Sequence, residues 1–130
     1  MSASFYTWTN AISADAHAVL EDGVGIVIGA DSNHAAFTTA APTAGGKVDY
    51  IAKDKAPAAG DVVGLAVVNI GDIVQLRADA AVVYGANVMV QANGRFITAT
   101  ATNTTQYKAI QAASQGSVFS AVRIEAETVA

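Results

Sequence analysis

The sequence is poor in the residues that most enzyme chemistry requires. Its 130 residues include no cysteine, two histidines and two prolines. The lack of cysteine excludes disulfide scaffolds, thiol redox chemistry, cysteine nucleophiles and cysteine-based zinc sites. The two histidines, His17 and His34, lie too far apart for the short spacings of zinc ligands, so we expect no metal site.

Positive charge is also scarce. Seven Lys and Arg face eleven Asp and Glu, giving a formal net charge of -4. Nucleic-acid binding needs clustered cations that neutralise phosphates, so we expect no nucleic-acid partner. The one concentration of lysines, Lys47, Lys53 and Lys55, is interleaved with aspartates, which favours a solvated strand edge.

Long apolar runs are missing. Residues 64–68 and 80–90 are the best candidates, and both fall short of the roughly 18 residues that a membrane helix needs. Residues 1–13 contain no Lys or Arg, unlike the start of a secretory signal. We therefore expect no membrane partner and synthesis in the cytoplasm.

Motifs for catalysis or cofactor binding do not occur. Glu21 and Asp22 are adjacent, but neighbours in a strand point to opposite faces, so we interpret them as a solvated loop. No GxSxG pattern is present, and the glycines at 23–25 and 45–46 lack the phosphate-loop signature and are interpreted as turns. We expect a protein that is not an enzyme and has no cofactor.

The composition favours an all-β fold. The chain has 16 Val, 9 Ile and 11 Thr but only 3 Leu, and β-branched residues fit a pleated sheet better than a helix. Its 29 Ala are scattered and form no helical stripe. Because small side chains each bury little area, we expect oligomerisation to add stability.

Turn signals recur about every eight to twelve residues from Val24 onward, which predicts a small β-barrel or sandwich of short antiparallel strands. Asn93-Gly94 predicts a hairpin with a type I′ turn between residues 88–91 and 95–100. Two-residue alternation predicts three pairs of core residues. These pairs are Val74 and Leu76, Val88 and Val90, and Val122 and Ile124.

The N-terminal part is less regular. We interpret residues 1–12 as an irregular N-terminal arm and residues 13–130 as a single β-rich domain. The arm holds Phe5, Tyr6 and Trp8, which either pack on their own domain or anchor a partner. Ser13 as a cap and Gly23 as a terminator favour one short helix over residues 13–22.

An internal duplication is a further hypothesis. At an offset of 60 residues, Gly25 aligns with Gly85 and Ile28 with Val88, followed by Asn33 with Asn93 and Thr38 with Thr98. At an offset of 56, Gly60 aligns with Gly116 and Val62 with Val118. Two unrelated hairpins with similar turns would align equally well, so both duplication and coincidence can explain the matches.

Several motifs occur in a familiar order between residues 56 and 125. They are Gly71-Asp72-Ile73-Val74-Gln75-Leu76, Gly85-Ala86-Asn87-Val88, Asn93-Gly94-Arg95, and a closing segment from Ala112 through Gly116 to Val122-Arg123-Ile124. This order resembles the capsid decoration, or cement, proteins of tailed bacteriophages. The chain departs from the pattern at residues 107–110, where such proteins often have a V-G-x-A strand start.

The resemblance implies a structural virion protein that binds the outer surface of an assembled capsid and stabilises it. It implies the major capsid protein as partner, a homotrimer as the usual assembly, and a place on the capsid exterior. Phe5, Tyr6 and Trp8 would then anchor the arm on the capsid or on a neighbouring protomer. A tail- or fibre-associated β module and a small-ligand-binding barrel remain alternatives.

Overall fold

A computed structural model describes residues 11–28 and 38–130 of the chain, and within these ranges the fold is all-β, as predicted. No helix in this part is long and apolar enough to cross a membrane. One five-stranded sheet contains β1 (Ala11–Asp15), β2 (Gly25–Ile28), β3 (Thr39–Ala40), β4 (Tyr50–Ala52) and β5 (Val62–Ala66). The other contains β6 (Ile73–Arg77), β7 (Asn87–Val90), β8 (Phe96–Thr98), β9 (Thr104–Ala109) and β10 (Val118–Thr128).

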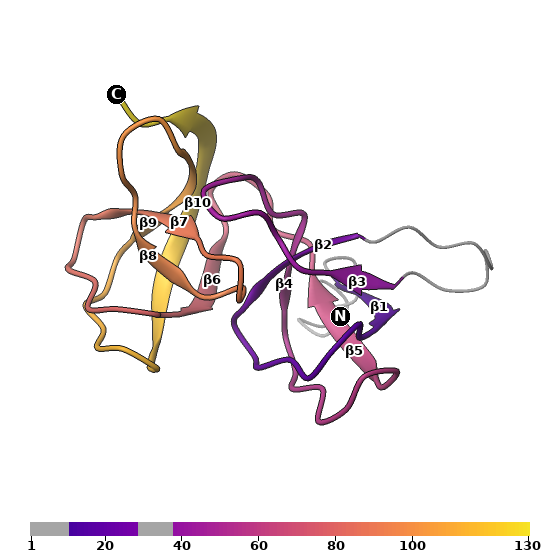
Figure 1. The fold of residues 1–130 in the computed structure, drawn as a ribbon. Helices are drawn as coiled ribbons and strands as arrows, with labels where there is room; N and C mark the ends of the chain where they lie inside the picture. The colour runs from indigo at the N-terminus through magenta and orange to yellow at the C-terminus, as the bar shows by residue number, and fades with distance from the viewer. Residues whose placement is uncertain (1–10, 29–37) are drawn as a thin grey trace, which may run out of the picture.

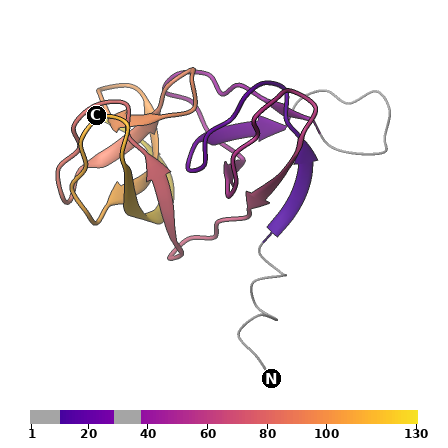
Figure 2. The same ribbon diagram turned by 90° about the horizontal axis from the view of Figure 1, so that it is seen from below.

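The two sheets form two lobes that lie side by side (Figures 1 and 2). Their strand orders are β1-β5-β4-β2-β3 and β6-β10-β9-β7-β8, and all neighbouring strands are antiparallel. In the first sheet a parallel bridge joins Asp15, at the end of β1, to Thr38, directly before β3. Ala78 and Phe96 make the equivalent bridge in the second sheet. Each sheet therefore curls toward closure, consistent with the predicted small barrel.

The two strand orders are the same order with every number raised by five, so the chain contains two structural repeats. We call residues 11–66 the N-terminal repeat and residues 73–128 the C-terminal repeat. Backbone hydrogen bonds recur at equivalent places in both. They are Ala16 N to Asp61 O and Ala78 N to Ser117 O, Leu20 N to Ala56 O and Val82 N to Ala113 O, Gly23 N to Ala52 O and Gly85 N to Ala109 O, and Gly60 N to Ala16 O and Gly116 N to Ala78 O, all at 2.8–2.9 Å.

The structure corrects the first half of the duplication alignment. Gly85 corresponds to Gly23 and not to Gly25, and both glycines have φ of 85°. Such a positive φ is costly for other residues, so the turn requires glycine at this position. The alignment of Gly60 with Gly116 is confirmed, because the two donate equivalent hydrogen bonds and have φ of 90° and 84°.

Each repeat has its own core, and the two cores differ in size. The C-terminal core surrounds Phe96, Tyr107 and Phe119, with the first two rings edge to face at 5.8 Å between centroids. Two residues of the N-terminal repeat, Val48 and Ile51, belong to this core. The N-terminal core is built mainly from alanines and aliphatic residues and contains no aromatic ring among its buried members. The repeats are therefore joined by apolar packing as well as by the chain.

The expected helix over residues 13–22 is wrong. Residues 11–15 form β1, which pairs with β5 along its whole length, and the following residues form turns and a bridge at Leu20. Alternate alanines, Ala14 and Ala16, are buried in the N-terminal core. Packing of this face outweighs the weak helix propensity of a short segment. Residues 11 and 12, assigned to the arm from the sequence, belong to β1, and residues 1–10 lie outside the described ranges.

The predicted 93–94 hairpin exists, but its turn type is wrong. β7 pairs with β8, and Gly94 has φ of 86°, whereas Asn93 does not have a positive φ. Gly94 N bonds to Gln91 O and Gln91 N to Arg95 O. This is a type I turn followed by a glycine bulge, in which one positive φ suffices. The side-chain Oδ1 of Asn93 accepts a bond from Arg95 N at 3.0 Å, which stabilises that form.

The two-residue alternation of apolar and polar side chains predicted the buried face of β6 and β7 correctly, but predicted the wrong face for β10. Val88, Val90 and Leu76 are buried, and Val74 is partly buried. In β10 the core residues are Phe119 and Ala121, on the opposite parity from the predicted Val122 and Ile124. Strand β10 has apolar residues on both faces, and its pairing with β9 shifts register after residue 123. Its sequence alone therefore did not define the buried face.

Candidate functional site

The residues singled out for chemistry do not form a catalytic or metal centre within the described ranges. His17 is exposed, and its Nδ1 lies 2.7 Å from Oγ1 of Thr39. Residues 11–28 and 38–130 contain no group of three or more His, Asp or Glu that could hold a metal ion. His34 and the proposed anchors Phe5, Tyr6 and Trp8 lie outside the described residues, so the predictions about them stay predictions.

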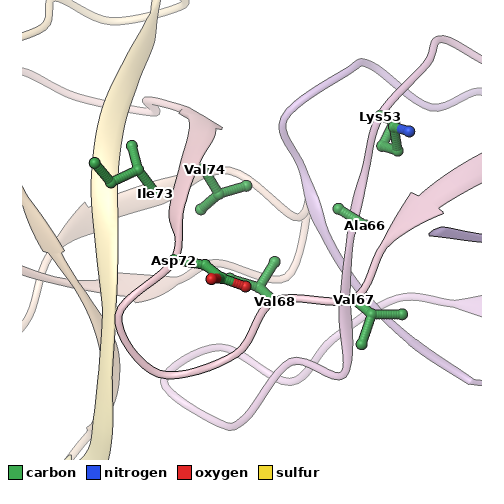
Figure 3. A pocket seen from close by; sticks show the side chains of 7 residues that line it. All are labelled: Lys53, Ala66, Val67, Val68, Asp72, Ile73 and Val74. Carbon is green, nitrogen blue, oxygen red and sulfur yellow. The ribbon is translucent and has the colours of Figure 1, made fainter. Parts of the chain in front are cut away.

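Two hollow features lie along the boundary between the repeats. Two adjoining cavities of about 350 and 360 Å³ share four lining residues, Lys53, Ala66, Ile73 and Val74. We call them together the inter-repeat groove. Lys53 and Ala66 come from the N-terminal repeat and lie across the groove from Ile73 and Val74 of β6 (Figure 3). The lining is mixed, because Asp22, Lys53, Asp72 and Gln75 contribute polar groups beside the apolar side chains.

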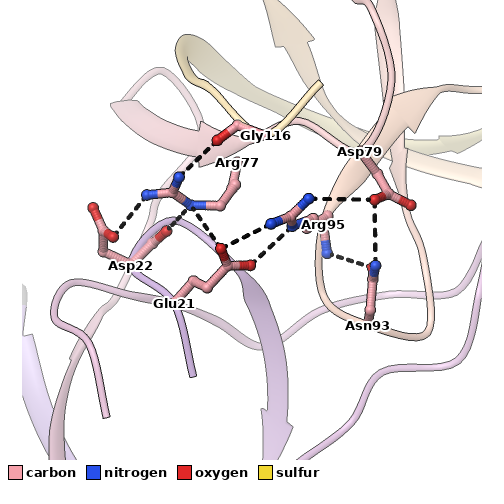
Figure 4. A network of polar contacts seen from close by, with 7 residues as sticks. All are labelled: Glu21, Asp22, Arg77, Asp79, Asn93, Arg95 and Gly116. Atoms are coloured by element: carbon pink, nitrogen blue, oxygen red, sulfur yellow. Dashed lines mark hydrogen bonds and ion pairs between the residues drawn. The ribbon is translucent and has the colours of Figure 1, made fainter. Parts of the chain in front are cut away.

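A network of ion pairs joins the repeats on another part of their boundary (Figure 4). The guanidinium group of Arg77, on β6, donates to Asp22 Oδ1 at 2.7 Å, to Asp22 O at 3.0 Å and to Gly116 O at 2.8 Å. Its side chain is only 17% exposed. Arg77 therefore links the turn before Gly23 to two segments of the C-terminal repeat.

Arg95 makes the second link of the network. Its Nε and Nη2 atoms donate to the two carboxylate oxygens of Glu21, both at 2.8 Å, and its Nη1 lies 3.7 Å from Asp79. The hydrogen bond from Arg95 holds the pKa of Glu21 below its usual value, and the same bond raises the pKa of Arg95. The interpretation of Glu21 and Asp22 as a simple solvated loop is therefore wrong, because both carboxylates are used to join the repeats.

Backbone contacts fix the same boundary. Arg77 N donates to Gly23 O at 2.9 Å, and Gly25 N donates to Gly94 O at 2.8 Å. A Cβ at Gly25 would lie 3.1 Å from Phe96 and 3.2 Å from Val90 of the C-terminal repeat, so the repeats approach this closely because the residue is glycine. Buried Gln106 also donates to and accepts from the backbone of Val48. The joint is thus specific in its hydrogen bonding and apolar in its centre.

Several large apolar side chains are left on the surface. They are Val19, Val62, Ile70, Ile73, Val83, Tyr84 and Val118. Val83 and Tyr84 are 67% and 74% exposed, and they occupy the positions that correspond to Glu21 and Asp22 in the other repeat. The sequence patterns gave no signal for them, because alternation predicts which residues face a core and not which remain uncovered.

No protein-family model and no curated protein sequence matches the chain. Among solved structures, its fold is similar to that of a phage head fibre base. That structure is the crystal structure of the head fiber gp8.5 N base in bacteriophage phi29, matched with a TM-score of 0.74 over 87% of this chain and 92% of that chain. The two sequences are 15% identical over the match. At this identity the similarity establishes a shared fold, and function has to be argued separately.

Proposed function

We propose that the chain is a structural protein of a phage virion that binds the outer surface of the assembled capsid and stabilises it. The observation that carries the coarser part of the proposal, a structural protein of a phage virion, is the match of 87% of the chain to the base of a phage head fibre. The resemblance of residues 56–125 to capsid decoration proteins supports it, because that resemblance rests on sequence order and not on the fold.

The physical character of the molecule suits this role. Its two repeats are locked together by apolar packing, buried hydrogen bonds and ion pairs, so it can present a fixed surface. A protein that binds the assembled lattice and not the free subunits stabilises the lattice by mass action. A trimer would add avidity, because each further contact forms at high effective concentration. The proposed role needs no catalytic group.

The proposal is tested with empty heads of the phage that encodes the chain. Purified protein is mixed with assembled heads or with unassembled major capsid protein, and bound protein is measured by sedimentation. We expect binding to the heads only, at a regular number of copies per particle, and a higher melting temperature of the heads. Equal binding to free subunits, or no change in head stability at saturation, would contradict the decoration role.

A fibre-associated role is the second candidate. It is favoured by the similar solved structure, which is the base of a head fibre. Electron microscopy of virions distinguishes the two roles. A decoration protein gives a low layer of density over the capsid, whereas a fibre base lies beneath a projecting rod. Light scattering during size-exclusion chromatography tests the proposed trimer in the absence of a capsid.

A further inference from the structure

The hairpin between β7 and β8 carries the only Asn-Gly pair of the sequence, Asn93-Gly94. Asn-Gly pairs are prone to deamidation, because glycine has no side chain to keep its backbone nitrogen from the side-chain carbonyl carbon of the asparagine. This pair also lies in the joint between the repeats, since Gly94 O accepts a hydrogen bond from Gly25 N at 2.8 Å. A chemically reactive sequence is thus placed where the two repeats meet.

Deamidation of such a pair needs only water and solvent base. The backbone nitrogen of Gly94 loses its proton to base and attacks Cγ of Asn93. The new bond between these atoms closes a succinimide ring, and Nδ2 takes up a proton and leaves as ammonia. Water then opens the ring. Cleavage of the bond to Cγ gives aspartate, and cleavage of the bond to the main-chain carbonyl carbon of residue 93 gives isoaspartate, whose backbone is longer by one carbon.

The closed structure opposes the first of these steps. The N–H group of Gly94 donates to Gln91 O at 2.9 Å and Gly94 is buried, so solvent base has no access to its proton. The Asn93 side chain has contacts of its own (Figure 4): its Oδ1 accepts from Arg95 N at 3.0 Å, and its Nδ2 lies 3.4 Å from Asp79 Oδ1. Both reacting groups are therefore engaged elsewhere while the hairpin keeps this form.

The N-terminal repeat holds the hairpin in this form. Arg95 donates to both carboxylate oxygens of Glu21, each at 2.8 Å. A Cβ at Gly94 would lie 2.9 Å from Cβ of Val24, so the N-terminal repeat covers this glycine closely. Proteins open locally as well as globally, and opening of the joint alone would remove these contacts without unfolding either sheet. The hairpin would then expose the N–H group of Gly94 to solvent.

We propose that Asn93 is a site of spontaneous deamidation and that opening of the joint between the repeats sets its rate. The products oppose reclosure of the joint. Isoaspartate lengthens the backbone inside the turn, which separates Gly94 from the positions where it meets Gln91 and Gly25. Aspartate replaces the Nδ2 donor with a carboxylate oxygen next to Asp79, and like charges repel. The modified fraction therefore records how long the joint has been open.

Peptide mapping by mass spectrometry measures the modified fraction of residue 93 after incubation at mildly alkaline pH. We expect fast modification in concentrated urea and much slower modification in the native protein. Arg77→Gln removes the ionic hydrogen bonds to Asp22 at the joint but none of the contacts of the hairpin. It should raise the native rate about ten- to hundredfold. Lys108→Gln is the matched control, because it removes an exposed cation of β9 outside the joint, and it should leave the rate unchanged.

Low concentrations of urea distinguish opening of the joint from global unfolding. The rate through a local opening rises less steeply with urea than the equilibrium constant for global unfolding, because less surface becomes exposed. Equally steep dependences would overturn the proposal, as would native modification as fast as in concentrated urea or no modification in either condition. An unchanged rate in folded Arg77→Gln would also overturn it.

A second variant covers the case in which circular dichroism shows Arg77→Gln to be unfolded. Glu21→Gln is milder, because the Glu21 side chain is 42% exposed, and it should raise the native rate by up to about fivefold. An unchanged rate in this variant would then contradict control by the joint. None of these measurements involves a capsid, so the proposal holds or fails independently of the decoration role.

Discussion

Alanine substitution at two matched glycines measures how tightly the repeats are joined. Gly85 and Gly94 have φ of 85° and 86°, so alanine meets the same backbone penalty of about 1 to 2 kcal/mol at either position. A Cβ at Gly85 has no atom within 4 Å. A Cβ at Gly94 would lie 2.9 Å from Cβ of Val24 and 3.0 Å from the carbonyl oxygen of Gly25, across the joint. Such overpacking costs about 1 to 3 kcal/mol more.

We therefore expect Gly85→Ala to lower the free energy of unfolding by about 1 to 2 kcal/mol and Gly94→Ala by about 2 to 5 kcal/mol. Urea denaturation followed by circular dichroism gives both values. The dependence of the free energy of unfolding on urea concentration should be the same in both variants as in the wild type if the two repeats unfold together. Equal losses in the two variants would show that the hairpin of the C-terminal repeat does not press on the N-terminal repeat. The close joint described above would then be refuted.

Three further predictions concern single side chains. Glu21→Gln should cost less than about 1 kcal/mol at neutral pH, because the side chain is 42% exposed. Arg95 lowers the pKa of Glu21, so the ion pair stabilises the fold above about pH 4.5, and this stabilisation is lost as the pH falls further. The urea midpoint of Glu21→Gln should therefore fall less than that of the wild type when the pH is lowered below 4.5. Burial raises the pKa of Tyr107 from 10.0 to about 12, so this residue's contribution to stability should be constant below pH 10 and fall above it. Melting temperatures measured at increasing alkaline pH should therefore decline less in Tyr107→Phe than in the wild type. Among the described residues, Thr102 is the one non-glycine residue with positive φ. Thr102→Gly should therefore raise the free energy of unfolding, measured by calorimetry, by up to about 1 kcal/mol. A lower free energy of unfolding in the variant would refute the backbone strain assigned to Thr102.

Local signals in the sequence predicted much of the fold. The abundance of Val, Ile and Thr indicated strands, and the spacing of turn residues indicated a small barrel. The hairpin at Gly94 was found because an Asn-Gly pair between two apolar runs is a strong marker of a tight turn between strands. These features depend on neighbouring residues, so a single sequence is enough to reveal them.

Features that depend on distant residues were missed. Glu21 meets Arg95 only after the two repeats pack together, and nothing near either residue in the sequence marks the pair. The groove brings Lys53 and Ile73 together from two sheets and has no motif. The equivalence of Gly23 and Gly85 could have been found from the sequence by aligning turn glycines first, because alanine identities carry no information at this alanine content.

The strand order has a consequence for synthesis of the chain. In each repeat the first strand pairs with the last, β1 with β5 and β6 with β10, so neither barrel can close until its final strand has left the ribosome. The N-terminal repeat emerges first, with Val48 and Ile51 still lacking the partners that bury them. Burial of these two side chains therefore has to wait until the C-terminal repeat has been synthesised.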